Sequence, residues 1–264
     1  MKIIVTGSSG FIGFHVSKKL LENGNKVHGV DSMNNYYDIN LKKARLSILK
    51  KYKNFSFSKT KVENNKNLDK VFKKFKPIIV IHLAAQAGVR YSINKPRVYL
   101  NSNITGTYNI IEISKKLNVK HLIIASSSSV YGANKRIPFK EIDKTETQMS
   151  IYASTKKSNE SMAHAYSNIW KLPITMVRFF TVYGPWGRPD MALFKFTKGI
   201  LNNKKIDIYN NGKMYRDFTY IDDIVNCINL LIKKVPNSKQ LGKYKYDSLS
   251  PIAPFRILNI GNAK

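Results

Sequence analysis

The start of the chain holds the feature that most constrains its fold, an apolar run followed by a glycine-rich turn and a helical pattern. Lys2–Thr6 is an apolar run, with Ile3, Ile4 and Val5 at its centre, and it leads into Gly7, Gly10 and Gly13, which are spaced as GxxGxxG. Phe11–Leu21 then carries apolar residues at helical spacing. Such a strand–turn–helix unit lets the backbone approach a phosphate closely, and the helix N-terminus offers free amides and a positive dipole end. The pattern therefore predicts a dinucleotide-binding βαβ unit.

An acidic residue at the end of the next apolar run refines this prediction. Lys26–Val30 is predicted to be the second strand, and Asp31 follows it directly. A carboxylate there accepts hydrogen bonds from the hydroxyls of an adenosine ribose and repels a 2′-phosphate, so NAD is predicted in preference to NADP. The alternative is a plain glycine turn with a helix-capping aspartate. The distances along the chain fit a single βαβ unit, which favours the cofactor interpretation.

Strand-like and helical segments alternate through residue 179. Further strands are predicted at Phe55–Lys59, Ile78–Leu83, Lys120–Ala125 and Ile174–Phe179. Helices are predicted at Asp38–Tyr52, Asn67–Phe75, Pro96–Leu117 and Ser150–Trp170. Alternation of this kind predicts an α/β fold with a doubly wound parallel Rossmann sheet over residues 1–179. The weaker pattern after residue 180 predicts a small substrate-binding lobe over 180–264, with an irregular loop at 233–254.

The charge is the most unusual property of the composition. The formal net charge is +29, which on its own suggests a nucleic-acid or membrane-surface binder. The lysines, however, occur mostly as pairs on predicted helix surfaces, and the sequence contains no recognisable nucleic-acid motif. We interpret the charge as compositional drift and expect neither nucleic acid nor membrane as a partner. A single cysteine and no apolar run long enough to cross a bilayer predict a reducing, cytoplasmic setting, and no histidine spacing suggests a metal site.

Three side chains have the chemistry for removing a proton from a sugar hydroxyl. Tyr152 and Lys156 are four residues apart on a predicted helix and therefore share a face. Ser127 belongs to a serine run that ends the preceding strand. An ammonium beside a phenol favours the phenolate, and a serine hydroxyl can orient the substrate hydroxyl while the neighbouring carbon gives hydride to NAD. A tyrosine and a lysine at this spacing also occur by chance as surface residues.

Six segments together resemble the extended short-chain dehydrogenase/reductases. They are TGSSGFIG, HLAAQAGVRYS, SSSSVYG, YASTKKSNE, RFFTVYGPWGRPDMALFKFT and GKMYRDFTYIDD. Within that group the chain most resembles the UDP-glucuronate 4-epimerase family, over essentially its whole length. The resemblance implies a Rossmann domain that binds NAD, a small C-terminal substrate lobe and a homodimer.

The resemblance also implies roles for individual residues. The expected catalytic residues are Tyr152, Lys156 and Ser127. The expected cofactor-binding residues are Gly7, Gly10, Phe11, Ile12, Gly13, Asp31, Leu83, Ala84, Ala85, Asn101, Tyr152 and Lys156. The expected substrate-binding residues are Arg90, Ser128, Ser129, Thr181, Arg188 and Arg216. For Arg90, a plain surface position is an equally open interpretation.

The chain departs from the family pattern at two places. Lys61 stands where the family usually has an acidic residue that contacts adenine, which weakens the expectation of a complete adenine site. The chain also ends at NIGNAK, whereas the family continues with helices that complete the substrate lobe. The sequence therefore predicts an apparently truncated lobe and an incomplete pocket for the nucleotide base.

The implied reaction interconverts UDP-glucuronate and UDP-galacturonate through a 4-keto sugar, and the product suggests polysaccharide biosynthesis. Two alternatives remain open. One is a UDP-glucose 4-epimerase or a related nucleotide-sugar decarboxylase or dehydratase, although the serine run lacks the Asp-Glu pair that a dehydratase needs. The other is an NAD-binding protein without activity, which the Lys61 substitution and the early end of the chain favour, and which the Tyr152, Lys156 and Ser127 set opposes.

Overall fold

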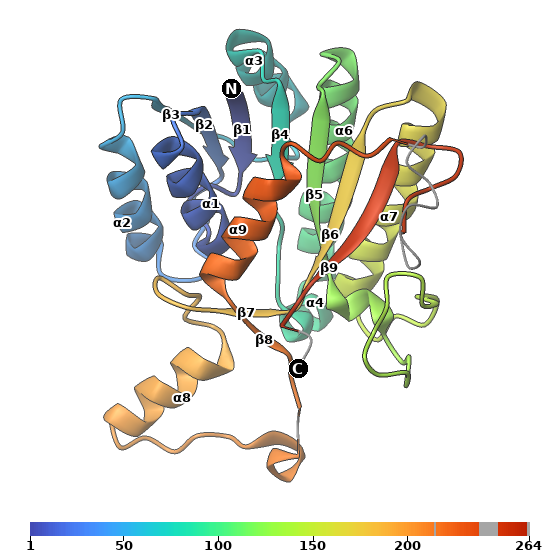
Figure 1. Ribbon diagram of the computed structural model, residues 1–264. Coiled ribbons are helices and arrows are strands. Elements are labelled where there is room, and N and C mark those ends of the chain that lie inside the picture. Colours follow the sequence, from blue (N-terminus) through green and yellow to red (C-terminus); the bar gives the residue numbers. More distant parts are fainter. Residues whose placement is uncertain (214, 238–247, 263–264) are drawn as a thin grey trace.

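The computed structural model describes residues 1–213, 215–237 and 248–262. Seven parallel strands form its central sheet in the order β3-β2-β1-β4-β5-β6-β9 (Figure 1). Their bounds are β1 Lys2–Thr6, β2 Lys26–Asp31, β3 Phe55–Lys59, β4 Ile79–His82, β5 His121–Ser127, β6 Ile174–Phe179 and β9 Phe255–Ile260. The predicted doubly wound α/β fold is therefore confirmed.

Helices cover both faces of this sheet. On one face, α1 (Phe11–Glu22) packs between α2 (Ile39–Lys50) and α9 (Ile221–Leu231). On the other face, α6 (Gly106–Lys116) lies between α3 (Asn65–Phe75) and α7 (Ile151–Trp170). Figure 1 shows the two layers in front of and behind the strands. Short helices α4 (Val89–Asn94) and α5 (Pro96–Tyr99) precede a π-helical segment, Leu100–Thr105, that continues into α6.

The apolar strands are buried on both faces, as their sequences require. Ile3 and Ile81 belong to the core beneath α1 and α9, whereas Ile4 and Val80 belong to the core beneath α3 and α6. Successive side chains of a strand point to opposite faces, so a continuous apolar run suits a sheet covered on both sides. Each such side chain contributes about 1.5–3 kcal/mol when it is fully buried.

The strand order also fixes where a ligand can bind. β1 pairs with β2 on one side and with β4 on the other, so the connections from this centre run in opposite directions along the sheet. Loops that follow the carboxyl ends of β1 and β4 therefore separate and leave a crevice. The glycine-rich turn follows β1, and Leu83–Ala85 follows β4.

The chain after residue 180 is divided in space. β7 (Thr181–Tyr183), α8 (Ala192–Leu201) and β8 (Phe218–Tyr220) lie outside the main sheet, and β7 pairs with β8 in a separate ribbon (Figure 1). In contrast, α9 and β9 return to the main body, where β9 pairs with β6. The predicted boundary at residue 180 stays a prediction, but only part of 180–264 lies apart. Of the predicted loop at 233–254, residues 238–247 lie outside the described residues.

No helix in the described part of the chain has the length and apolar character that crossing a membrane requires. Within the same part, no three His, Cys, Asp or Glu side chains are grouped as metal ligands would be.

Candidate active site

A cavity of about 400 Å³ lies at the carboxyl edge of the sheet and collects most of the predicted site residues. Its lining includes eleven of the twelve predicted cofactor residues: Gly7, Gly10, Phe11, Ile12, Gly13, Asp31, Leu83, Ala84, Ala85, Tyr152 and Lys156. The predicted catalytic Ser127 and the predicted substrate cation Arg188 line the same cavity. The fold thus brings together residues separated by up to 181 positions in the sequence, from Gly7 to Arg188.

The glycine-rich turn is packed so closely that side chains are excluded at two positions. Gly7 has φ +73°, and a Cβ there would lie 2.8 Å from the backbone nitrogen of Ala84. A Cβ at Gly13 would lie 2.0 Å from the carbonyl oxygen of Gly7. The first glycine therefore permits the turn against the loop after β4, and the second lets the start of α1 approach the turn. The exposed backbone of such a turn is what a pyrophosphate needs.

Asp31 serves the turn as well as the cavity. Its Oδ2 accepts a hydrogen bond from the Ser9 amide at 3.1 Å, and its Oδ1 accepts one from the Met33 amide at 2.8 Å. A carboxylate oxygen has more than one acceptor position, so both oxygens can still accept from a ribose hydroxyl. The same residue therefore fixes the glycine turn and presents a negative charge to the cavity.

The absence of an acidic residue at Lys61, which the sequence suggests would weaken the adenine site, is offset by a neighbour in the structure. Lys61 lines the cavity, and so do its neighbours Val62 and Glu63. An acidic side chain is therefore available two residues beyond the position where the family resemblance places one.

Tyr152 and Ser127 both line the cavity and share a side-chain hydrogen bond. Burial raises the pKa of the Tyr152 phenol above its ordinary value, whereas a hydrogen bond from Ser127 and the positive charge of Arg188 lower it. Ser127 also accepts a hydrogen bond from the Ser129 amide at 3.2 Å, which orients its hydroxyl. The Ser127 hydroxyl and the Arg188 cation therefore both favour the ionised form of the Tyr152 phenol.

Lys156 lies one helical turn after Tyr152 on α7, as the spacing predicts. Its ammonium is buried and donates to the Ala125 carbonyl of β5 at 2.8 Å. Burial lowers the pKa of Lys156 to about 8, and the negative charge of Glu160 opposes that shift. The ammonium is therefore fixed against the end of β5.

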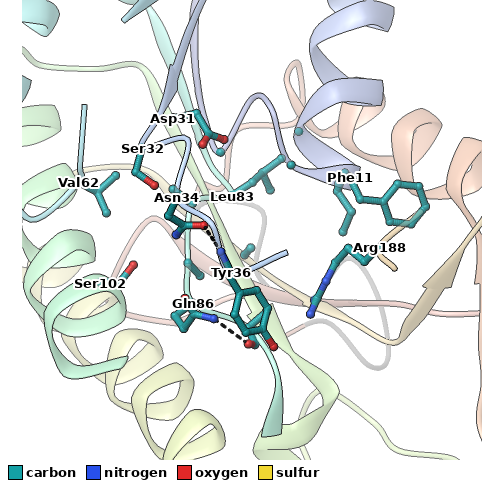
Figure 2. A pocket seen from close by; sticks show the side chains of 18 of the residues that line it. Phe11, Asp31, Ser32, Asn34, Tyr36, Val62, Leu83, Gln86, Ser102 and Arg188 are labelled. Atoms are coloured by element: carbon teal, nitrogen blue, oxygen red, sulfur yellow. Dashed lines mark hydrogen bonds between the residues drawn. The ribbon is translucent and has the colours of Figure 1, made fainter. Parts of the chain in front are cut away.

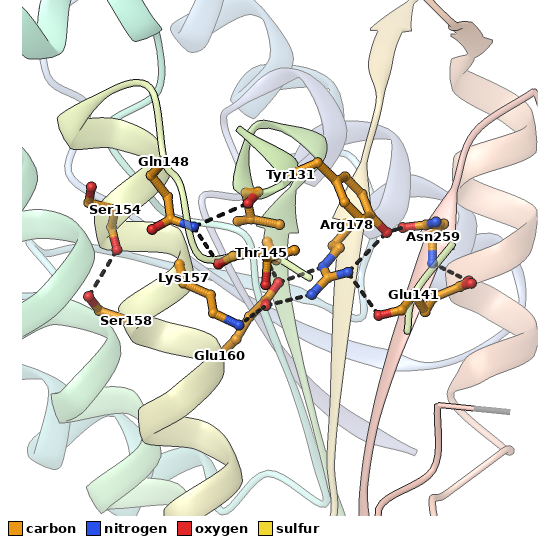
Figure 3. Close-up of polar contacts among 12 residues, drawn as sticks. Tyr131, Glu141, Thr145, Gln148, Ser154, Lys157, Ser158, Glu160, Arg178 and Asn259 are labelled. Carbon is orange, nitrogen blue, oxygen red and sulfur yellow. Dashed lines mark hydrogen bonds and ion pairs between the residues drawn. The ribbon is translucent and has the colours of Figure 1, made fainter. Parts of the chain in front are cut away.

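Glu160 continues the same helix face and anchors a buried polar network (Figure 3). The guanidinium of Arg178 donates to both carboxylate oxygens, at 2.9 and 2.8 Å, and the Ser126 hydroxyl donates to one of them at 2.6 Å. Arg178 also donates to the Tyr131 hydroxyl at 2.9 Å. Figure 3 shows this chain of contacts running from α7 across β6 toward Asn259 of β9. A bidentate, buried pair of this kind holds α7 in register with the strand ends.

Arg188 enters the cavity from the segment after β7 and is already paired. Its Nε donates to Asp190 Oδ1 at 3.1 Å, and Asp190 Oδ2 also accepts from the Tyr36 hydroxyl at 3.3 Å. This pairing with Asp190 helps raise the pKa of Arg188, so the guanidinium is cationic. Figure 2 shows Arg188 and Tyr36 arriving from different elements at the same part of the cavity.

Asn101 is the one predicted cofactor residue outside the cavity. It is exposed, and its neighbour Ser102 lines the cavity instead. Both residues lie in the π-helical segment, whose wider turns change which side chains face inward. A regular α-helix over Pro96–Leu117 was the expectation from sequence, so the difference has a local structural cause.

Several predicted substrate residues also lie outside that cavity. Ser128 and Ser129 form a 3-10 turn after β5, and Thr181 opens β7. Arg216 is exposed just before β8, and its guanidinium donates to the Tyr215 carbonyl at 2.8 Å. Arg90 lines a second hollow of about 390 Å³. The other basic residues around that hollow are Lys195, Lys198, Lys204 and Lys205.

Other residues of the site were not found from sequence. Tyr36 and Lys42 line the cavity, and Glu160 and Arg178 support it. Glu160 had a usable signal, because residues 152, 156 and 160 repeat at a spacing of four and share one helix face. Tyr36 had none, because its loop carries no periodic pattern.

Comparison with known proteins agrees with this geometry. Residues 3–245 match the model of the NAD dependent epimerase/dehydratase family. Protein CapI of Staphylococcus aureus is 56% identical over 264 residues, which is 99% of this chain and 78% of that protein. A probable UDP-glucuronate 4-epimerase of Rhizobium meliloti is 48% identical, over 100% of this chain and 78% of its own length.

A solved structure shows the same fold. The UDP-glucuronic acid 4-epimerase of Bacillus cereus, in complex with UDP-glucuronic acid and NAD, superposes with a TM-score of 0.85. It is 34% identical, over 99% of this chain and 77% of that one. The resemblance inferred from motifs is thus confirmed, and the chain belongs to the NAD dependent epimerase/dehydratase family.

Proposed function

We propose that this chain is an NAD-dependent UDP-glucuronate 4-epimerase that interconverts UDP-glucuronate and UDP-galacturonate. The observation that carries the proposal is the single cavity shared by the glycine-rich turn, Asp31, Tyr152 with Ser127 and Lys156, and Arg188. One cavity therefore offers a dinucleotide site, a base for a sugar hydroxyl and a cation for a sugar carboxylate.

The residues present fit NAD. Gly7, Gly10 and Gly13 line the cavity without side chains, and Asp31 keeps acceptor capacity toward the cavity. Gly7, Gly10 and Gly13 would hold the pyrophosphate, Asp31 the adenosine ribose, and Lys156 the nicotinamide ribose. When bound, NAD supplies a reversible acceptor for the hydride of the sugar carbon.

The protein's own part in the chemistry is to move one proton and to hold one anion. Tyr152 accepts the proton of the 4-hydroxyl, and Ser127 orients that hydroxyl. The guanidinium of Arg188 makes the buried phenolate less costly, since it is a positive charge that acts on the phenol, and the hydrogen bond from Ser127 has the same effect. The 4-keto sugar then turns so that its other face meets the cofactor. When the hydride returns to C4, the Tyr152 phenol gives the proton back to the C4 oxygen.

A glucuronate brings a hazard that the site must control. A carboxylate β to a transient ketone can leave as carbon dioxide. The enzyme must therefore hold the carboxylate in an orientation that disfavours this loss. We propose that the Arg188 guanidinium binds this carboxylate and that Ser128, Ser129 and Thr181 add hydrogen bonds to it. A neutral hydroxymethyl group would need none of these, which is why a charged sugar is the better substrate for this site.

The test is a product analysis. The purified chain is incubated with UDP-glucuronate, and the C4 epimers are resolved. Formation of UDP-galacturonate supports the proposal. UDP-xylose or a 4-keto pentose as the main product would identify a decarboxylase, faster conversion of UDP-glucose would identify a UDP-glucose 4-epimerase, and NAD binding without any conversion would identify a binding protein.

We further propose that the chain is a homodimer that works in the cytoplasm and supplies a sugar for polysaccharide synthesis. Two helices that pack side by side, α6 and α7, leave apolar side chains exposed, among them Tyr108, Ile151, Ile169 and Trp170. Exposed apolar side chains on a pair of packed helices suit a self-association surface. Sedimentation at increasing protein concentration tests it.

A further inference from the structure

The segment that carries Arg188 is fixed to the cofactor-binding body by side chains from three of its elements. We call this segment, Gly184–Asp190, the Arg188 loop. From α1, His15 Nε2 lies 2.9 Å from the Pro185 carbonyl. From the loop after β2, Tyr36 donates to Asp190. The third contact, from α2, is the most extensive.

That third contact is made by Arg45, whose side chain is 0% exposed. One terminal nitrogen donates to the Ser9 carbonyl of the glycine-rich turn at 3.1 Å and to the Tyr37 hydroxyl at 2.8 Å. The other donates to the Gly187 carbonyl at 3.2 Å and, at shorter range, to the Trp186 carbonyl. One guanidinium therefore joins the turn that holds the cofactor to the loop that carries Arg188.

The chemistry of these contacts explains why the position needs an arginine. Burial lowers the pKa of Arg45, and the negative charge of Asp31 and the contact with Tyr37 oppose the shift, so the group stays protonated. All four of its hydrogen-bond acceptors are neutral oxygens. Only a rigid, forked donor can reach two separate backbone segments at once, whereas a lysine ammonium is a compact point charge.

We propose that Arg45 is a positioning residue that couples the glycine-rich turn to the Arg188 loop. In this arrangement the cation for the sugar carboxylate keeps its place only while the cofactor turn keeps its shape. The coupling between the two loops follows from the contacts of Arg45 alone. Its consequence for catalysis rests on the proposed function, because it requires Arg188 to bind the substrate.

A fluorescence experiment tests the coupling without any turnover. The chain has two tryptophans, and Trp170→Phe leaves Trp186 of the Arg188 loop as the only one. In that background Arg45→Lys and Arg45→Met are compared with Lys43→Met, which removes an exposed charge from the same helix. We expect acrylamide quenching of Trp186 to rise about twofold in the Arg45 variants and to stay unchanged in the control, because the loop loses its anchor.

A double-mutant cycle with UDP-glucuronate tests the consequence. Arg45→Lys is expected to lower kcat/KM about 10- to 100-fold in the wild-type background, since a small displacement of a binding group has effects of that size. In an Arg188→Met background the same change is expected to have little further effect, because the group that it positions is already absent.

The outcomes separate this inference from the proposed function. Unchanged Trp186 quenching in a folded Arg45→Lys protein overturns the coupling, whereas a fully additive cycle overturns its consequence for catalysis. If the wild-type chain converts no UDP-glucuronate, the proposed function fails, while the quenching comparison still decides whether Arg45 holds the loop.

Discussion

Apolar residues are mostly buried in the body of the molecule, formed by the main sheet and its helices, and mostly exposed in the segment from β7 to β8. Every residue of β5 is buried, whereas Gly199 is the only buried residue of α8, a helix that stands apart from the main sheet in Figure 1. Yet α8 is as apolar as α9, which packs in the core, and its exposed side chains include Leu193, Phe194, Phe196, Ile200 and Leu201. A helical apolar pattern therefore predicts a helix without telling what its apolar side contacts.

This difference decides how each part of the site is positioned. Tyr152 and Lys156 are on a helix whose inner face is buried against β5 and β6, so packing fixes them. Arg188 belongs to a loop with little apolar burial, so polar contacts with the body fix it. Changes in the body should therefore affect chemistry or folding directly, and changes in the segment should affect mainly substrate binding.

The largest expected effect is on the base. Tyr152→Phe removes the hydroxyl that takes the proton, and we expect kcat to fall about 10²- to 10⁴-fold, the usual contribution of a general base. Binding of NAD, measured by calorimetry, should change little because the ring remains. Tyr108→Phe on the exposed side of α6 is the matched control, and a similar loss there would contradict the assignment.

A matched pair of isoleucines tests the comparison through stability. Ile124 of β5 is 0% exposed and Ile200 of α8 is 64% exposed. Ile124→Ala should cost about 2–5 kcal/mol of unfolding free energy, because it leaves a cavity in a packed core. Ile200→Ala should stay within about 0.5 kcal/mol. Denaturant unfolding measures both, and equal losses would mean that α8 is buried in solution.

The sequence predicts the body well because burial governs it. The predicted bounds of β1, β3 and β6 agree with the structure to the residue. Nearly every residue of β1 and β6 is buried, whereas β3 alternates Phe and Ser and is only partly buried at the edge of the sheet. Disagreement begins where local geometry overrides the pattern. The predicted helix at Pro96–Leu117 contains a π-helical segment, and that segment turns Ser102 rather than Asn101 toward the cavity.

The candidate site was predictable to the extent that its residues follow regular elements. The glycine turn, Asp31 and the Tyr152 helix follow from strand ends and helical spacing. Arg45 and Tyr36 do not, because their roles depend on loops that meet only in the folded chain, far apart in sequence. A resemblance in motifs pointed to Arg188, but not to the residues that hold it.

A smaller and more selective effect is expected at Arg188, the cation in the segment from β7 to β8. Arg188→Met should lower kcat/KM for UDP-glucuronate about 10- to 100-fold, as expected when a charged hydrogen-bond donor is lost. The loss with UDP-glucose should be smaller, because that sugar has no carboxylate at C5. Measuring both substrates side by side gives the ratio, and an equal loss with both would show that Arg188 acts on the Tyr152 phenol or the diphosphate and not on the carboxylate.

The smallest expected effect is a shift in a pH profile within the body. Because the pKa of Lys156 lies near 8, the ammonium is lost as pH rises through that value, and kcat should decline on the alkaline side. The charge of Glu160 favours the protonated form, so Glu160→Gln should move this decline to lower pH. Glu160→Asp keeps the charge while disturbing the contact with Arg178, so its decline should stay near pH 8 even if its Tm falls. A shift of equal size in both variants would mean that packing against Arg178, and not the charge of Glu160, controls the ammonium.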